Sequence, residues 1–350
     1  MAQKAIAVRQ ELTSFAPHVP RVYSRRHWLS LLGVFEVAAQ IGEGGMVQGF
    51  CDRHQADTSG RHQDSHRVTR RAAPLEGLHH MNPNKALWEK GDFTRIAASM
   101  RESGEAVVAG LSITPGLKVL DLGCGDGTTA LPAARLGADV LGVDIASNLV
   151  EAGNRRAQAE GLTNCRFQEG DATNLSELAD RRFDLVVSIF GAMFAPKPFD
   201  VAKEMVRVTR PGGRIVMGNW IPGDPTLVAQ TLKISSSYSP PPPEGFVSPM
   251  TWGIEANVSE RFAAAGIPAE RIAFARDTFT FRSARTPAAF VADFRDFYGP
   301  TMNAFAAAEL TGKSAELQQE LEALFERQNQ SKAAGATSIP ATFLRVTVTR

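Results

Sequence analysis

Cysteine is scarce in this chain of 350 residues, which contains only Cys51, Cys124 and Cys165. Three thiols cannot build a disulfide framework, so we expect a reducing, cytoplasmic setting. Long apolar runs are missing as well, since the stretch 28–41 is interrupted by Glu36 and is too short to cross a bilayer. A formal net charge of only +1 argues against a general electrostatic hold on nucleic acid or anionic lipid. With 43% hydrophobic residues, the chain has enough apolar side chains for a globular core.

Histidine is absent after residue 80, although seven histidines precede that point. Residues 1–80 also hold ten basic and seven acidic residues, whereas the remainder has a small excess of acids. This shift marks a boundary at Met81. Polar composition and weak periodicity predict that 1–80 is a poorly ordered, His/Arg-rich extension that the function does not need. Two other interpretations are an Arg-rich targeting leader and a zinc site with the candidate ligands Cys51, His54, His62 and His66.

Beyond Met81, short apolar runs alternate with helical segments. This pattern predicts an α/β fold with a doubly wound, mostly parallel sheet and helices on both faces. The ligand site of such a sheet lies at the carboxyl ends of its strands. The predicted strands are 118–122, 140–145, 165–168, 183–189 and 214–219, and the predicted helices are 86–111, 128–136, 148–160, 175–179 and 199–208.

The regular alternation ends near residue 220. Seven prolines in 221–251 argue against a helix or a central strand in that stretch. Further on, a helix is predicted at 258–265, a strand at 271–281, helices over 287–329 and a strand at 342–348. We therefore expect a core of residues 81–285, a helical cap insertion at 286–336 and a closing strand of the core at 337–350.

The most informative segment is 119–128, in which an apolar run passes through three glycines at alternate positions into a helix. Glycine tolerates the backbone angles of such a turn and lets a ligand approach the main chain closely. The helix N-terminus adds free N–H groups. Dinucleotide-binding loops instead carry G-x-G-x-x-G and hold a pyrophosphate. Here Asp121 and Asp126 place negative charge beside the loop, which disfavours a pyrophosphate and favours a cationic ligand.

Carboxylates follow the next two predicted strands. Asp144 comes 23 residues after Asp121, at a place where a carboxylate can accept hydrogen bonds from both hydroxyls of a ribose. A cap for the helix that begins near Ser147 is the alternative role. Asp171 follows the third strand, where a carboxylate can accept a bond from an adenine amino group, and a surface turn is the competing interpretation.

Taken in order, these segments resemble the class I S-adenosylmethionine-dependent methyltransferases, especially the small-molecule enzymes of ubiquinone and menaquinone biosynthesis. The matching segments are 119–127, 143–144, 169–172, 183–189 and 207–213. The resemblance implies S-adenosylmethionine as cofactor and a Rossmann-like, seven-stranded sheet with an antiparallel last strand. It also implies that loop 123–127 holds the methionine part of the cofactor, Asp144 the ribose and Asp171 the adenine. The residues expected to bind the cofactor are Trp88, Asp121, Gly123, Cys124, Gly125, Gly127, Asp144, Ile145, Asp171, Ala172 and Ser188.

The missing histidines also bear on mechanism, because histidine is the most common general base. Either the acceptor attacks as a lone pair or already deprotonated, or a carboxylate or tyrosine takes its proton. The candidates are Tyr238, Tyr298, Asp224 and Glu244. No metal site is expected in the enzyme, and no basic patch interleaved with aromatic residues points to nucleic acid. Apolar and aromatic residues after the fourth strand, in the Pro-rich stretch and in the helical cap predict a small, partly apolar acceptor; they are Phe190, Met193, Phe194, Trp220, Phe246, Met250, Trp252 and Tyr298.

Two other functions remain open on the sequence. One is an NAD(P)-dependent oxidoreductase on a Rossmann fold, which would bind NAD and not the sulfonium. The other is a non-catalytic S-adenosylmethionine-binding module, which would bind the cofactor and methylate no acceptor.

Overall fold

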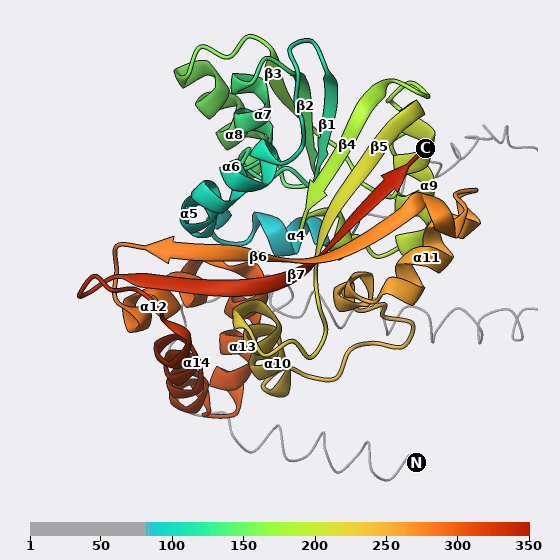
Figure 1. The fold of residues 1–350 in the computed structure, drawn as a ribbon. Helices are drawn as coiled ribbons and strands as arrows, with labels where there is room; N and C mark the ends of the chain where they lie inside the picture. Colours follow the sequence, from blue (N-terminus) through green and yellow to red (C-terminus); the bar gives the residue numbers. More distant parts are fainter. Residues whose placement is uncertain (1–81, 83) are drawn as a thin grey trace, which may run out of the picture. The chain divides into compact units, whose positions relative to one another are not determined.

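The computed structural model describes Asn82 and residues 84–350 (Figure 1). The predictions for residues 1–80, including the zinc site and the targeting leader, and the boundary at Met81 lie outside the described residues. In the described part of the chain, every helix is too short or too polar to span a bilayer.

A seven-stranded sheet forms the centre of the fold, in the order β3-β2-β1-β4-β5-β7-β6. Neighbouring strands from β3 to β5 are parallel, whereas β7 is antiparallel to both β5 and β6. The predicted fold class, a doubly wound and mostly parallel sheet with an antiparallel last strand, is confirmed. The strands are β1 Lys118–Leu122, β2 Asp139–Asp144, β3 Cys165–Glu169, β4 Phe183–Ile189, β5 Thr209–Trp220, β6 Ile272–Ser283 and β7 Thr337–Thr349.

The central strands β1 and β4 are mostly apolar and buried because both faces of the sheet are covered. In β1, Val119 belongs to one buried cluster, and Leu120 and Leu122 belong to the other. In β4, Leu185 joins the cluster of Val119 and Val186 joins the opposite one. Successive side chains of a strand point to opposite faces, so each short apolar run supplies both layers of the core.

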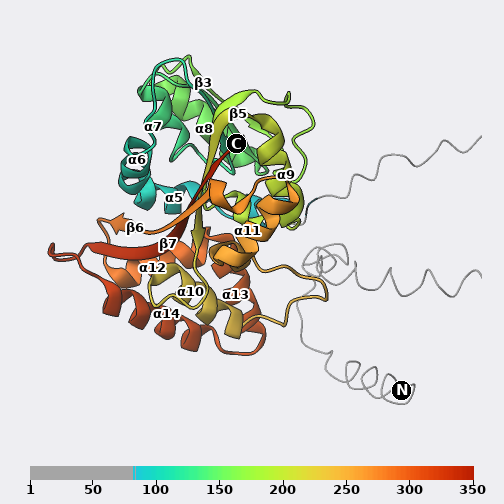
Figure 2. The same ribbon diagram turned by 45° about the vertical axis from the view of Figure 1, so that its right-hand side comes forward.

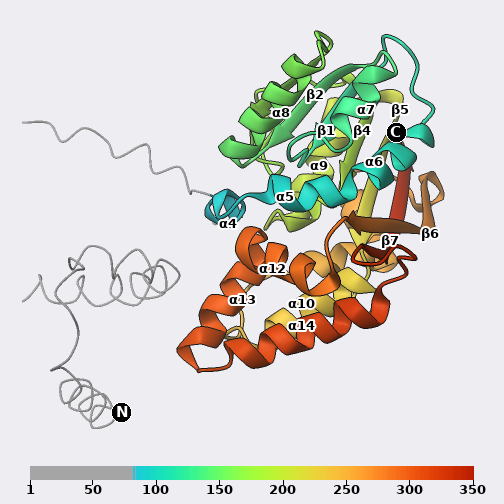
Figure 3. The same cartoon turned by 90° about the vertical axis from the view of Figure 1, so that its left-hand side faces the viewer.

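The helices form two groups (Figures 1 and 2). One group flanks the sheet: α6 Arg101–Ala109, α7 Ala130–Arg135, α8 Ser147–Ala159, α9 Pro198–Val208 and α11 Glu255–Ala264. The other group packs together beyond the carboxyl ends of the parallel strands: α10 Leu227–Ser237, α12 Pro287–Phe297, α13 Gly299–Leu310 and α14 Ser314–Gln328. Figure 3 shows the short helices α4 Asn84–Glu89 and α5 Phe93–Ala97 at the level between these two groups.

Two predicted helices differ in the structure. The single helix predicted at 86–111 is broken into α4, α5, a 3-10 turn and α6. Gly91 ends the first piece with a left-handed φ of +79°, and Asp92 caps the next by accepting a hydrogen bond from the N–H of Thr94. The helix predicted at 175–179 is wrong, because that stretch forms turns only.

The prediction that 221–251 contains no helix is also wrong, because α10 lies within it. The prolines flank this helix and none falls inside it, so every backbone N–H of its interior remains a donor. Thr226 precedes its first residue, and the run Pro240–Pro243 follows its end. The number of prolines in 221–251 therefore did not reveal the proline-free segment between Pro225 and Pro240.

Candidate functional site

One large cavity lies at the carboxyl ends of the parallel strands, with an empty volume of ≈ 1290 Å³ that includes the solvent at its mouth. Its walls come from the loops that follow β1, β2, β3 and β4, and from α4 and α5. The opposite walls come from β6, α10 and the segment where α12 meets α13. The winding of the sheet reverses between β1 and β4, which is where a doubly wound sheet opens toward a ligand.

The three glycines of the loop after β1 have different roles. A Cβ on Gly123 would lie 2.6 Å from the Cα of Gly191, and one on Gly127 would lie 2.7 Å from Cζ of Phe167. These two glycines allow close packing of the loop against its neighbours. Gly125, at a φ of +54°, is different, because the atom nearest to its Cβ position is 4.0 Å away. Gly125 lines the cavity, so at this position bare main chain faces open space.

Asp144, at the end of β2, connects its own loop to the glycine loop. Its Oδ2 accepts a hydrogen bond of 2.8 Å from the N–H of Gly125, and its Oδ1 accepts one of 3.0 Å from the N–H of Ala146. Burial raises the pKa of this carboxyl group, and the backbone donors oppose that rise. Asp144 therefore lines the cavity as a carboxylate held by main-chain N–H groups on both sides.

Asp171 lies in the turn after β3 and also lines the cavity. Its Oδ1 accepts bonds from the N–H and the hydroxyl of Thr173, at 2.8 and 2.9 Å. Its Oδ2 accepts a bond of 3.0 Å from Nδ2 of Asn82, in the segment before α4. Glu89, at the end of α4, accepts two bonds from Ser147, at 3.1 Å from the N–H and 2.7 Å from the hydroxyl. The segment 82–89 is thus attached to the ends of β2 and β3.

Asp126 is the third carboxylate in the cavity wall, and it is 1% exposed. Its Oδ2 lies 2.8 Å from a guanidinium nitrogen of Arg101 and 3.3 Å from one of Arg156. Arg156 also donates a bond of 2.6 Å to the backbone carbonyl of Asp126. Burial raises the pKa of Asp126, and the two arginines oppose that rise. These contacts attach the glycine loop to α6 and α8.

Three residues expected to bind the cofactor lie behind the cavity wall instead: Asp121, Gly127 and Ser188. Asp121 is fully buried and accepts a hydrogen bond from the hydroxyl of Thr129. Burial, with a smaller contribution from Asp144, raises the pKa of Asp121 from 3.8 to about 7. The Ser188 hydroxyl accepts a bond of 2.9 Å from the N–H of Ala192. These three residues therefore support the loops from behind and do not face the cavity.

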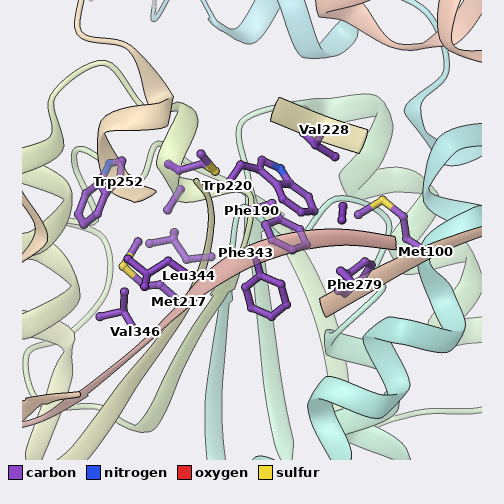
Figure 4. Close-up of a cluster of buried hydrophobic side chains, with 14 of the residues drawn as sticks. Met100, Phe190, Met217, Trp220, Val228, Trp252, Phe279, Phe343, Leu344 and Val346 are labelled. Atoms are coloured by element: carbon purple, nitrogen blue, oxygen red, sulfur yellow. The ribbon is translucent and has the colours of Figure 1, made fainter. Parts of the chain in front are cut away.

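Aromatic rings form much of the remaining cavity wall, and Phe93 reaches the glycine loop. Trp88 meets Phe194 edge to face, with ring centroids 4.9 Å apart, and meets Phe93 in the same way at 5.6 Å. Phe190 stacks on Trp220 at 3.6 Å (Figure 4). All five residues line the cavity. Trp88 is half-buried and packs against the core as well, so it belongs both to the cavity wall and to the edge of the core.

The four candidate bases are not brought together. Tyr298 lines the cavity, whereas the other three do not. Tyr238 donates a hydrogen bond of 2.6 Å to Glu320 at the surface. Asp224 is 6% exposed and accepts hydrogen bonds in the turn before α10. Glu244 is exposed in the Pro-rich loop.

The residues expected to contact an acceptor divide in the same way. Phe190, Phe194 and Trp220 line the cavity, but Met193, Phe246, Met250 and Trp252 do not. Trp252 is 1% exposed and packs under the guanidinium group of Arg261, whose Cζ lies 4.5 Å from the ring centroid. Phe246 is 55% exposed. Aromatic composition alone does not separate a cavity wall from core or surface.

Sequence reasoning missed several apolar residues of the wall. The periodicity of a helix and of a strand could have indicated some of them. Positions 228, 231 and 232 of α10 share one helical face, and positions 279 and 281 of β6 share one face of a strand. Neither pattern indicates which partner the face meets. The missed apolar residues include Ile96, Met100, Leu149, Val228, Leu232, Phe279, Phe281 and Phe294.

Comparisons with known proteins agree with this geometry. Residues 120–217 match the family model described as a methyltransferase domain. The chain is 34% identical over 243 residues to the uncharacterized protein Rv1405c of Mycobacterium tuberculosis, covering 67% of this chain and 86% of that protein. It is 39% identical over 114 residues to the demethylmenaquinone methyltransferase of Paenarthrobacter aurescens, covering 33% of this chain and 43% of that enzyme. The matched segment contains the glycine loop and the strands whose ends form the cavity, and the chain belongs to the class I S-adenosylmethionine-dependent methyltransferases.

Proposed function

We propose that this methyltransferase alkylates a small, partly apolar acceptor by in-line displacement, without a histidine base. The observation that carries the proposal is the division of one cavity into two chemically different ends. At one end, Asp144 accepts a hydrogen bond from the bare main chain of Gly125, and Asp171 follows the neighbouring strand β3. At the other, the wall consists of the rings of Phe190 and Trp220 and their neighbours. We call these the donor end and the acceptor end.

The residues at the donor end fit S-adenosylmethionine. Gly125 leaves space where any side chain would project into the cavity. Asp144 and Asp171 offer acceptor oxygens to ribose hydroxyls and to an adenine amino group. Negative charge around the loop complements a sulfonium and an ammonium group, whereas a diphosphate would meet carboxylates. We therefore assign Gly125 to the methionine part, Asp144 to the ribose and Asp171 to the adenine, with Ile145 and Ala172 beside the base.

The chemistry asks the protein mainly to position its ligands. S-adenosylmethionine supplies an electrophilic methyl group on a positively charged sulfur, and transfer leaves a neutral thioether, the methylated acceptor and, from a protonated nucleophile, one proton. The chain holds the acceptor in line and keeps water out with apolar walls. Such positioning contributes roughly 7–11 kcal/mol to lowering a barrier.

No side chain of the acceptor end is suited to remove a proton at neutral pH. Tyr298 is the candidate base that lines the cavity. Burial raises the pKa of Tyr298, so it stays protonated and serves as a hydrogen-bond donor. Residues 81–350 contain no histidine. An acceptor that attacks through a lone pair, or that ionises in solution, needs no base.

Calorimetry and a turnover screen test the proposal. The chain should bind S-adenosylhomocysteine and should not bind NAD. With radiolabelled S-adenosylmethionine, label should transfer to apolar phenols, thiols or amines in a panel of small acceptors. Affinity for NAD without affinity for S-adenosylhomocysteine would refute the donor site, and binding without any transfer would indicate a non-catalytic module.

A further inference from the structure

The charged residues of the cavity wall all lie at one end and all carry the same sign. They are Asp126, Asp144 and Asp171, from the loops after β1, β2 and β3. Among the described residues that line the cavity, none is a lysine, an arginine or a histidine. An acceptor that carries a carboxylate or a phosphate would therefore be buried without a cationic partner from the protein wall. Burying an unpaired anion in such a site is strongly unfavourable.

Two hydroxyl groups interrupt the apolar wall of the acceptor end. Thr231 lies on the same face of α10 as Val228 and Leu232, and all three line the cavity. Thr231 is 2% exposed, and its Oγ1 makes no hydrogen bond within the described part of the chain. A buried hydroxyl without a partner is costly, so a group that reaches this wall with an acceptor or donor atom gains by pairing with it.

Tyr298 supplies the second hydroxyl, at the junction of α12 and α13. Its ring packs against those of Phe294 and Trp88, with centroids 5.4 and 6.1 Å apart, which fixes its position. The residue is 7% exposed and lines the cavity. Burial is the whole cause of its raised pKa, with no contribution from a hydrogen bond or a charge of a described residue. The phenol therefore retains its proton.

Three side-chain donors at the donor end are already engaged. Asn82 donates to Asp171, Asn84 donates to the backbone carbonyl of Phe194, and Thr129 donates to Asp121. The hydroxyls of Thr231 and Tyr298 thus add hydrogen-bonding capacity on the helical side of the cavity, opposite the sheet, beyond that of the carboxylates at the donor end.

We propose that Tyr298 and Thr231 determine acceptor specificity by hydrogen-bonding an oxygen or nitrogen substituent of an uncharged, ring-bearing acceptor, and that the cavity rejects acids. The flat apolar walls around Phe190 and Trp220 favour a ring. This inference rests on the proposed function, because it names the acceptor class of the same site.

Equilibrium dialysis with three probes tests the inference: 2-naphthol, naphthalene and 2-naphthoate, each with the full chain saturated with S-adenosylhomocysteine. The probes share one ring system and differ in a neutral hydroxyl, no polar group, or a carboxylate. The variants are Tyr298→Phe and Thr231→Val. Thr301→Val is the matched control, because Thr301 is also fully buried and unpartnered among the described residues but does not line the cavity.

We expect 2-naphthoate to bind at least about 100-fold more weakly than 2-naphthol, because its charge would be buried unpaired. At least one of Tyr298→Phe and Thr231→Val should weaken 2-naphthol binding about 3- to 10-fold, the value of one hydrogen bond. Naphthalene binding should change less than about 2-fold in the same variant, and Thr301→Val should leave all three probes unaffected.

Three outcomes would overturn the inference: equal affinity for 2-naphthoate and 2-naphthol, no binding of 2-naphthol, or equal losses for 2-naphthol and naphthalene. The last outcome would mean that the hydroxyls matter only for packing. S-adenosylhomocysteine binding, measured by calorimetry on every variant, separates this failure from that of the proposed function. A chain that binds S-adenosylhomocysteine but fails the probe test retains its donor site and loses only the acceptor class.

Discussion

Replacing Gly125 with alanine separates a ligand-facing glycine from a glycine needed only for its backbone angle. Gly125 has a left-handed φ of +54°, and its added Cβ would lie in the cavity, with the nearest atom 4.0 Å away. Gly161, in the turn after α8, has a φ of +67° and nothing within 4 Å of its Cβ position, and it does not line the cavity. Gly161→Ala therefore imposes a comparable backbone cost without touching the site.

The magnitudes follow from the two environments. An alanine in the left-handed region costs about 1–2 kcal/mol, so both variants should lose about that much free energy of unfolding. Only Gly125→Ala places a methyl group in the proposed ligand space. Overpacking of this kind costs about 1–3 kcal/mol, which weakens S-adenosylhomocysteine binding roughly 5- to 150-fold. Gly123→Ala should be the least stable of the three, because its Cβ would lie 2.6 Å from the backbone Cα of Gly191.

Urea unfolding measures the first quantity and calorimetry with S-adenosylhomocysteine the second. We expect Gly161→Ala to retain the wild-type affinity and Gly125→Ala to lose it at similar stability. Equal affinities in these two variants would refute the assignment of Gly125 to the ligand. A much lower stability of Gly125→Ala would show that the loop, and not the ligand, needs this glycine.

Three further predictions concern the carboxylates. Asp144→Ala should weaken S-adenosylhomocysteine binding about 10- to 100-fold in calorimetry, because hydrogen bonds to a charged group are lost; unchanged affinity would rule out the ribose role. Asp121 has a pKa raised from 3.8 to about 7, so the unfolded chain loses this proton first and wild-type stability falls as pH rises from 4 to 7. Asp121→Asn should abolish this fall in the free energy of unfolding. The fall is roughly 4 kcal/mol, because each pKa unit corresponds to about 1.4 kcal/mol. If urea unfolding shows the same loss of stability between pH 5 and pH 8 in both proteins, the prediction is wrong. Arg101→Ala should lower the free energy of unfolding in urea by about 1–3 kcal/mol, because it removes one partner of buried Asp126. The control Arg95→Ala breaks an exposed ion pair and should lower it by under about 1 kcal/mol. Equal losses of stability in the two variants would argue against a structural role for the Asp126 pairs.

Much of the fold followed from local patterns in the sequence. The runs that became β1, β2 and β4 are rich in buried apolar residues because both sheet faces are covered, and a pattern of that kind needs no knowledge of distant residues. Helix predictions were wrong where a single residue ended a helix or where a short proline-free stretch allowed one to form. Gly91 ended a helix that periodicity alone would continue, and the gap between Pro225 and Pro240 left room for α10.

The amino-acid sequence alone predicted the residues that we propose for the donor end of the site. The glycine loop begins directly after a predicted strand, Asp144 lies near the end of the next, and Asp171 follows the third by three residues; parallel strands bring their carboxyl ends to one edge. Tertiary structure alone decided the acceptor end. Its wall joins Trp88, Trp220 and Tyr298, which are far apart in the chain, and nothing local separates them from Trp252 in the core. An apolar side chain gains free energy on either kind of surface, so only long-range packing decides whether it faces a cavity or another side chain.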